Sequence, residues 1–162
     1  MSLPSGREIT ALKQAKGQSE MLSFNKCFIM LCTKVTEEEC LSRSLFGDRK
    51  WRLDYLKEIT PGDIGFLFNM STNELIGPFV AKSEAQLDIE ENAWFGEFGA
   101  QVRVESLGEI KRLGGADGLL VLAGVPLDNL SSRVVVPLFP VHSHHVGERL
   151  LHAFGGDMQN EL

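Results

Sequence analysis

The sequence predicts an α+β domain with a mostly β core, either an open sheet or a small barrel, and helices around it. Two observations lead to this fold class. Apolar runs of strand length recur through the middle of the chain, and they are separated by segments whose apolar residues have helical spacing. The chain has 162 residues, of which 43% are hydrophobic and 23% charged, so one domain with a sizeable core is expected.

The first 22 residues are expected to precede the domain as a lead-in. Residues 5–22 are polar with weak helical spacing, which indicates a surface helix or a partly disordered segment. The domain is then expected to span residues 23–162. The N-terminus lacks the apolar core of a signal peptide, and no apolar run has the length needed to cross a bilayer. Cytoplasmic or nuclear residence without membrane contact is therefore the default, and we expect a cytoplasmic protein.

The domain opens with a strand followed by two helices. Lys26–Cys32, "KCFIMLC", is a continuous apolar run, typical of a strand buried on both faces. Thr36 is a suitable cap for the first helix, three glutamates favour its first turn, and Gly47 is the expected stop. The second helix, "WRLDYLKEI", is expected to place Trp51, Tyr55 and Ile59 on one face.

A hairpin occupies the centre of the chain. Residues 63–70, "DIGFLFNM", form its first strand, "STNE" its turn, and residues 75–84, "LIGPFVAKSE", its return. Gly77 and Pro78 predict a bulge or a sheet edge in the return strand, because proline cannot donate to a strand ladder.

The rest of the chain is read as a loop, further strands and a closing helix. Residues 85–96 make the loop, and residues 98–110 a strand on which Gln101 and Arg103 face away from the valines. Residues 119–125, "LLVLAGV", fit either a strand or a short helix, and residues 133–139 fit a strand. Residues 141–154 have helical spacing and close the domain.

Motifs for catalysis or cofactor binding are missing from the sequence. It contains no GxSxG, no phosphate-cradling GxxxxGK and no HExxH, so we expect neither an enzyme nor a cofactor. The three cysteines, Cys27, Cys32 and Cys40, form no CxxC pair and are expected to be buried thiols. The histidine group in "PVHSHHVGE" lacks cysteines or carboxylates at matching spacing, so no metal is expected there.

The charge pattern limits the partners. Net charge is -6 and the pI is about 5.2, with acidic and basic residues interspersed along the chain. Tight binding to long duplexes needs clustered Lys and Arg and is therefore disfavoured. A single base, a short strand or a peptide remains open as a ligand.

Several aromatic residues lie in polar, glycine-containing stretches. They are Trp51, Trp94, Phe95 and Phe98, and Phe46 directly precedes Gly47. Most aromatic side chains belong to the hydrophobic core, and this is the first interpretation of these residues. A tryptophan where a loop meets a strand can instead wall a pocket for a flat ligand, since stacking contributes about 1–3 kcal/mol per base.

In this order the elements resemble those of the DCD (development and cell death) domain family. The resemblance lies in "KCFIMLCTKVTEEECLSRSLFG", "YLKEITPGDIGFLFNMSTNELIGPFVAKSE" and "AWFGEFGAQVRV". The chain differs from the family in having Gly99 where proline is usual, Pro78 in the return strand, and no "LP" after "LFG". The resemblance implies a binding role, and it links the chain to stress and cell-death signalling.

The DCD family is in turn similar to the PUA-like group that includes the EVE, ASCH and YTH domains. This implies a small mixed β-barrel or open sheet with surrounding helices. The layout also resembles that of YTH domains, which bind a methylated base in an aromatic cage. By that resemblance Phe46 and Trp94 would be cage walls, with Cys32, Thr33 and Lys34 at the border. Phe46 stands where a YTH cage has tryptophan.

The leading hypothesis is thus a binding module for RNA or a nucleobase, modified or not, in an aromatic-lined pocket. Phe46 and Trp94 would stack on the base, Asn69 or Gln101 would read its edge, and Lys34, Arg49 or Arg103 would meet a phosphate. The alternative is a protein–protein module in stress or cell-death signalling, using a sheet edge near Pro78. The expected ligand-binding residues are Cys32, Thr33, Lys34, Phe46, Asn69, Trp94, Gln101 and Arg103.

Overall fold

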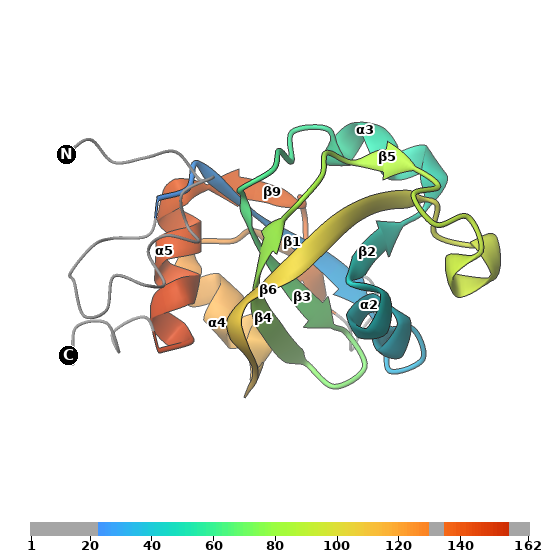
Figure 1. The fold of residues 1–162 in the computed structure, drawn as a ribbon. Coiled ribbons are helices and arrows are strands. Elements are labelled where there is room, and N and C mark those ends of the chain that lie inside the picture. The colour runs from blue at the N-terminus through green and yellow to red at the C-terminus, as the bar shows by residue number, and fades with distance from the viewer. Residues whose placement is uncertain (1–22, 130–134, 156–162) are drawn as a thin grey trace.

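A curled sheet runs through the middle of the molecule, with helices at both ends (Figure 1). The structure is a computed structural model and describes residues 23–129 and 135–155. Helices α4 (Ala116–Ala123) and α5 (His144–Ala153) lie at one end, and α2 (Glu37–Arg43) and α3 (Leu53–Leu56) at the other. The predicted α+β fold is confirmed. The predicted lead-in, residues 1–22, lies outside the described residues.

The sheet combines one parallel pair with antiparallel neighbours. Its strand order is β2-β6-β4-β3-β1-β9, and β5 pairs with β6 beside this path. Only β1 and β3 run parallel among the described pairs of this sheet. The strands are β1 (Lys26–Cys32), β2 (Leu45–Asp48), β3 (Ile64–Asn69), β4 (Glu74–Ala81), β5 (Gln86–Leu87), β6 (Ala100–Gly114) and β9 (Val141–Ser143). A separate two-stranded sheet pairs β7 (Leu127–Asn129) with β8 (Val135–Pro137).

The central strands are buried on both faces, as their continuous apolar runs predict. All residues of β3 are buried, and so are most residues of β1. Side chains alternate between the faces: Phe28 and Met30 belong to one cluster of buried apolar residues, and Cys27 and Ile29 to another. The sheet therefore separates two hydrophobic cores.

Each core is closed by a different part of the chain. The first core takes Cys40 from α2 and Leu56 from α3. The second takes Leu120 from α4 and Leu150 from α5, so the C-terminal third of the chain covers this face. All three cysteines are buried and free, as expected.

The central hairpin forms as predicted, including its irregularity. β3 and β4 pair antiparallel, and the pairing of β4 with β6 shifts register between Gly77 and Phe79. Of the two alternatives that Gly77 and Pro78 predicted, the bulge is present. The sheet edge is not, because β4 lies between β6 and β3 and pairs with both.

The first helix is shorter than the sequence suggested. It ends at Arg43, Ser44 takes a left-handed conformation with φ 52°, and Leu45 starts β2. The prediction that the helix continues to Gly47 was wrong because Phe46 and Gly47 pair with Val102 and Gln101 on β6. Strand pairing between distant segments outweighed local helix propensity here.

The second helix is also shorter and turns its aromatics outwards. A 3-10 turn, η2 (Lys50–Arg52), leads into α3, and Ile59 is buried beyond the helix end. Trp51 is 71% exposed and Tyr55 53% exposed, so the two rings do not share one face with the buried Ile59 as predicted.

The C-terminal part resolves the choice that the sequence left open. Residues 119–125 lie largely in the helix α4, not in a strand. The closing helix starts later than expected, because residues 141–143 pair with β1 as β9. Among the described residues no helix has the length and apolar character to cross a membrane, and no group of three potential metal ligands occurs.

Candidate ligand-binding site

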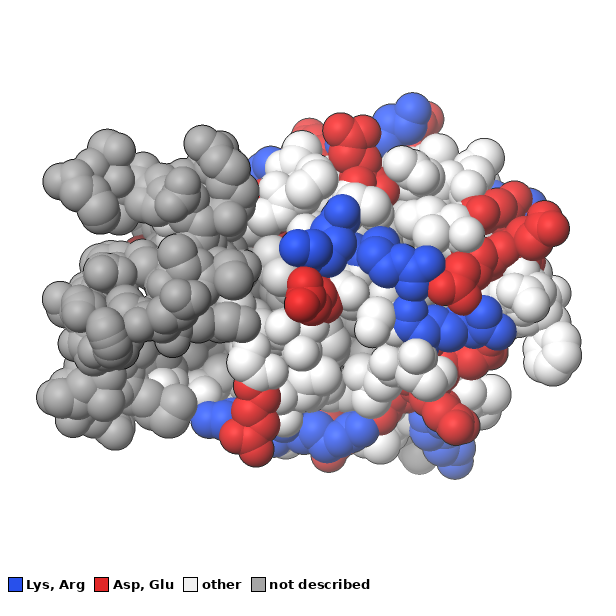
Figure 2. Space-filling view, viewed as in Figure 1, with Lys and Arg blue, Asp and Glu red and all other residues white. Residues whose placement is uncertain are grey.

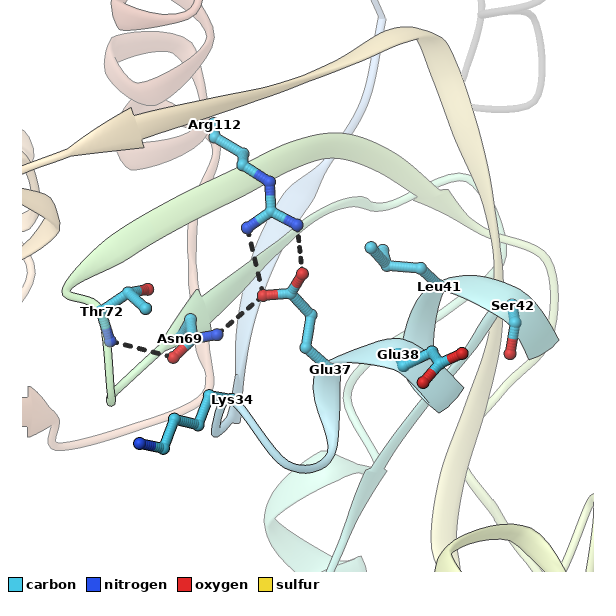
Figure 3. A pocket seen from close by; sticks show the side chains of 8 residues that line it. All are labelled: Lys34, Glu37, Glu38, Leu41, Ser42, Asn69, Thr72 and Arg112. Carbon is cyan, nitrogen blue, oxygen red and sulfur yellow. Dashed lines mark hydrogen bonds and ion pairs between the residues drawn. The ribbon is translucent and has the colours of Figure 1, made fainter.

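A polar pocket lies where β1 and β3 end beside α2. It has a volume of about 640 Å³, within the range of small-molecule sites. Figure 3 shows side chains from α2, from the hairpin and from β6 pointing into it. The lining residues are Lys34, Glu37, Glu38, Leu41, Ser42, Asn69, Thr72 and Arg112.

One side of this pocket is a fixed ion-paired group. The Glu37 carboxylate accepts from Asn69 Nδ2 (2.7 Å) and from both terminal nitrogens of Arg112, and Arg112 also donates to Glu74 Oε1 (3.0 Å). Arg112 and, after it, Asn69 hold the pKa of Glu37 below its usual value, while Glu37 raises the pKa of Arg112. Glu37 is thus ionised and bound in place, and it connects α2 to β3 and β6.

Asn69 is committed to this group and to the hairpin turn. Its side chain is buried, and its Oδ1 accepts from the backbone N–H groups of Ser71 (2.8 Å) and Thr72 (3.1 Å). Because both ends of the amide are occupied, Asn69 shapes the pocket wall instead of offering a free hydrogen-bonding edge to a ligand.

The other side of the pocket is open and chemically mixed. Lys34 and Glu38 are exposed and form no ion pair among the described residues, and Lys34 points away from the Glu37–Arg112 pair (Figure 3). Leu41 and Ser42 on α2 and Thr72 in the hairpin turn complete the lining, and the Thr72 hydroxyl donates to Glu74 Oε1 (3.0 Å). Together these groups offer a cation, an anion, hydroxyls and one apolar contact to a small ligand.

Phe46 does not line the pocket. Its relative exposure is 0%, and its ring packs edge-on against Phe79 (centroids 4.9 Å apart) and Phe28 (6.3 Å). Pairing with Val102 on β6 turns this side chain into the first core. The structure thus places Phe46 in the core, where the sequence suggested an aromatic wall.

Trp94 is also held inside the protein, with an exposure of 4%. Its Nε1 donates to the Thr36 carbonyl oxygen (3.1 Å), its backbone N–H donates to the Glu39 carboxylate (3.0 Å), and its ring lies against Gly47 and Phe98. Neither this indole nor the Phe46 ring presents a free face for a base to stack on.

Trp94 and Phe95 belong to a strained turn that displays one aromatic ring. In η3 (Ala93–Gly96) both residues have positive φ, 49° and 55°, a conformation that costs non-glycine residues about 1–3 kcal/mol each. Trp94 points inwards, whereas Phe95 is 100% exposed. The exposed Phe95 ring makes this turn a second candidate contact site, besides the pocket.

The remaining predicted residues support the pocket or the neighbouring loop. Cys32 is buried, and the neighbouring Cys40 thiol and, after it, burial raise the pKa of the Cys32 thiol. The Thr33 N–H donates to Thr36 Oγ1 (2.9 Å), and Thr33 Oγ1 accepts from the Val35 N–H (3.2 Å). The hydrogen bonds of Thr33 therefore stabilise the turn that contains Lys34.

Gln101 and Arg103 anchor the loop before β6. Buried Gln101 accepts from the Glu90 N–H (2.8 Å) and donates to the Glu90 and Phe98 carbonyl oxygens (3.1 Å each). Arg103 pairs with the Glu90 carboxylate (2.7 Å), whose pKa is held low by Arg43 first and Arg103 second. Both side chains are engaged within the protein, away from the pocket.

The structure thus brings only Lys34 and Asn69 of the predicted set together in one pocket. Six of its lining residues were missed. Glu37 and Arg112 are 75 positions apart, and only the strand order and register bring them into contact. Glu38, Leu41 and Ser42 looked like ordinary helix residues, and Thr72 like a turn residue.

Surface charge agrees with a ligand smaller than a duplex. Figure 2 shows a short band of Lys and Arg side chains across the middle of the visible face, with Asp and Glu side chains beside it at several points. A surface of this kind does not follow a long phosphate backbone.

The chain is similar in sequence to a family of domains. The family model for the Development and cell death domain matches residues 26–116. The chain is 42% identical over 84 residues to the B2 protein of Daucus carota, covering 48% of this chain and 41% of that protein. It is also 42% identical over 84 residues to the DCD domain-containing protein NRP-B of Glycine max, covering 48% of this chain and 26% of that protein. The alignments thus span less than half the length of these relatives.

The fold is similar to that of YTH domains. The Mmi1 YTH domain superposes with a TM-score of 0.53 at 14% identity, covering 83% of this chain and 78% of that one. The Pho92 YTH domain, solved in complex with m6A, gives a TM-score of 0.54 at 14% identity, covering 80% and 82%. These neighbours confirm the predicted PUA-like fold, and at such identity they show the fold alone.

Proposed function

Because the chain belongs to the development and cell death domain family, and because all the pocket residues fall inside the matched residues 26–116, we propose that this pocket is its ligand site. The ligand we propose is RNA, of which one nucleobase enters the pocket. The chain then acts as a non-enzymatic binding module. Neighbours of the same fold that were solved with RNA or m6A support this choice of ligand.

The observation that carries the proposal is the open side of the pocket. A nucleobase has flat apolar faces and polar edges, and RNA-binding modules recognise unpaired bases by both. Leu41 offers contact to a face. Glu38 accepts from an amino group, Ser42 offers a hydroxyl to the base edge, and Lys34 at the rim meets a phosphate. The Thr72 oxygen, whose hydrogen goes to Glu74, can still accept. An added methyl group on the base would find its apolar contact at Leu41.

The test is a titration of a fluorescently labelled adenosine-rich RNA heptamer, unmodified or with one N6-methyladenosine, followed by anisotropy. We expect Lys34→Ala to weaken binding about two- to fivefold, the range for losing one exposed ion pair. Lys82→Ala is the matched control, because Lys82 is an exposed lysine paired with Glu105 (3.4 Å) outside the pocket. The ratio of the wild-type chain's affinities for the methylated and the unmodified heptamer measures whether the modified base is preferred.

Equal RNA affinities of the Lys34→Ala variant and the wild-type chain would contradict the proposal that this pocket binds RNA.

The second candidate function is protein–protein contact, and the observation that favours it is the exposure of Phe95. A fully exposed aromatic side chain on a strained turn, next to exposed Glu91 and Glu97, fits an apolar pocket with a basic rim on a partner protein. The protein–protein function is supported if no RNA binds and if Phe95→Ala abolishes the capture of a defined partner.

A further inference from the structure

We propose that Trp51 and Tyr55 form a second RNA contact, a platform on which unpaired bases of the same single strand stack. The inference rests on the proposed function, since it takes RNA as the ligand, but it concerns another part of the surface. The platform is made by η2 and α3, between the first helix and the central hairpin.

The two rings are exposed and close to each other. Trp51 is 71% and Tyr55 53% exposed, their centroids are 6.4 Å apart, and their planes meet at 85°. Large aromatic side chains are usually well buried, and an exposed pair of them indicates a contact surface. Exposed aromatic rings are also what sequence-tolerant single-strand binding requires, because every base has a flat face to stack.

Arg52 holds this pair in place. Its guanidinium lies 5.5 Å from the Trp51 ring centroid and 5.0 Å from that of Tyr55, within the range of cation–π contacts. The Nε of Arg52 donates to the Asp48 carboxylate (2.8 Å), which fixes the guanidinium against β2. The rings are thus ordered before any ligand binds, and this lowers the entropy cost of binding.

One cation beside the platform remains available for a phosphate. Arg49 is exposed and lies over the Phe98 ring at 4.9 Å, and no carboxylate of the described residues pairs with its guanidinium. Lys50, in contrast, already pairs with Asp88 (3.4 Å). Residues 48–58 carry four basic and three acidic side chains, so the segment is close to neutral.

This charge balance favours a single strand over a duplex. Stacking supplies the affinity and Arg49 meets about one phosphate, whereas a duplex hides its base faces and offers only phosphates. The platform and the pocket lie at opposite ends of β2, since α2 precedes Leu45 and η2 follows Asp48. The two sites are built from different segments, the pocket from α2, the hairpin and β6 and the platform from η2 and α3, so we expect only an oligonucleotide to use both.

The experiment uses the intrinsic fluorescence of the two tryptophans in the whole chain. Trp94 is buried, so quenching by an unstructured uridine heptamer reports on Trp51. We expect the heptamer to quench this signal, and Trp51→Ala or Tyr55→Ala to weaken its binding, measured by anisotropy, about 5- to 150-fold, as for one lost stacking contact. Leu122→Ala, at another highly exposed apolar residue, is the control and leaves binding unchanged.

Salt dependence and ligand length separate this proposal from the pocket. Arg49→Ala should lower the slope of log affinity against log salt by about 0.7, the value for one single-strand phosphate. Adenosine monophosphate is too short to reach both sites at once, so Trp51→Ala should weaken its binding less than it weakens binding of the heptamer.

The outcomes distinguish the two sites. If Lys34→Ala weakens heptamer binding and Trp51→Ala with Tyr55→Ala does not, the platform is overturned and the pocket stands. If only the platform variants weaken it, the platform stands and the pocket falls. Quenching by a proline-rich peptide, with none by any RNA, would overturn the platform as an RNA site and assign these rings to a protein partner.

Discussion

Gly47 and Trp94 form a complementary pair in the first core. A Cβ at Gly47 would lie 2.5 Å from Trp94 Cζ3 and 3.0 Å from the Phe98 carbonyl oxygen, closer than atoms can pack. The missing side chain at Gly47 therefore leaves the space that the indole fills. At this scale the tryptophan that looked like a ligand contact is a packing residue.

The fit between these two residues predicts a non-additive pair of substitutions. Gly47→Ala should lower the free energy of unfolding by about 1–3 kcal/mol through overpacking, and Trp94→Ala by about 3–5 kcal/mol through the cavity left behind. In the double variant the new methyl enters the empty space, so the loss should be smaller than the sum, as urea unfolding can measure. Strict additivity would contradict the packing described here.

The first turn of α2 is connected to three strands through one carboxylate. Glu37 on the helix contacts Asn69 on β3 and Arg112 on β6, and Arg112 reaches Glu74 on β4. These contacts join a short helix to the sheet at the place where the pocket opens. At the level of elements, the same contacts that build the pocket also hold its wall.

The lowered pKa of Glu37 gives this connection a pH dependence. A carboxyl whose folded-state pKa lies below its unfolded value stabilises the fold fully above that unfolded value, about 4.3, and loses the contribution as the pH falls through the lowered pKa. We expect Glu37→Gln to lower the midpoint of urea unfolding at pH 7 and to flatten its decline between about pH 5 and pH 3.

The matched control is Glu38→Gln, in the same helical turn but without an ion pair among the described residues. It should leave the pH profile of unfolding unchanged. A decline of the same steepness in Glu37→Gln and the wild-type chain would show that other carboxyls carry it, among them Glu90 and Asp117, whose pKa values are also lowered.

The whole molecule depends on residues beyond the family match for its second core. The match ends at residue 116, yet Leu120, Leu150 and Phe154 cover the face of the sheet that carries Phe66. The ring of Phe154 stacks on that of Phe66 with centroids 5.5 Å apart. The C-terminal helices therefore complete a hydrophobic core that they share with the matched residues.

A chain that stops after Gly114 is accordingly expected to lose cooperative unfolding, since it exposes an apolar sheet face. The milder variant Phe154→Ala should lower the free energy of unfolding by about 3–5 kcal/mol, the usual cost of removing a buried Phe side chain. Differential scanning calorimetry measures both effects. A sharp transition in the shortened chain would mean that the first core folds alone.

The elements that could be predicted are those set by local pattern. β1, the central hairpin and the bulge near Gly77 follow from apolar runs and from proline chemistry, and the DCD resemblance follows from quoted motifs. The end of α2 could not be predicted, because β2 exists only through its pairing with β6. The pocket was missed for the same reason, since Glu37 meets Arg112 only through the register of the sheet.

By itself the sequence determined the fold class, the family and the burial of the cysteines, because periodicity and motif order are properties of the chain read in one dimension. The tertiary structure decided which aromatics are available. Phe46 and Trp94 turn into the core, while Trp51 and Tyr55 turn outwards. The physical reason is that exposure depends on which distant segments pack against a residue. Here the pairing of β2 with β6 buries Phe46, and the space above Gly47 accommodates the Trp94 ring.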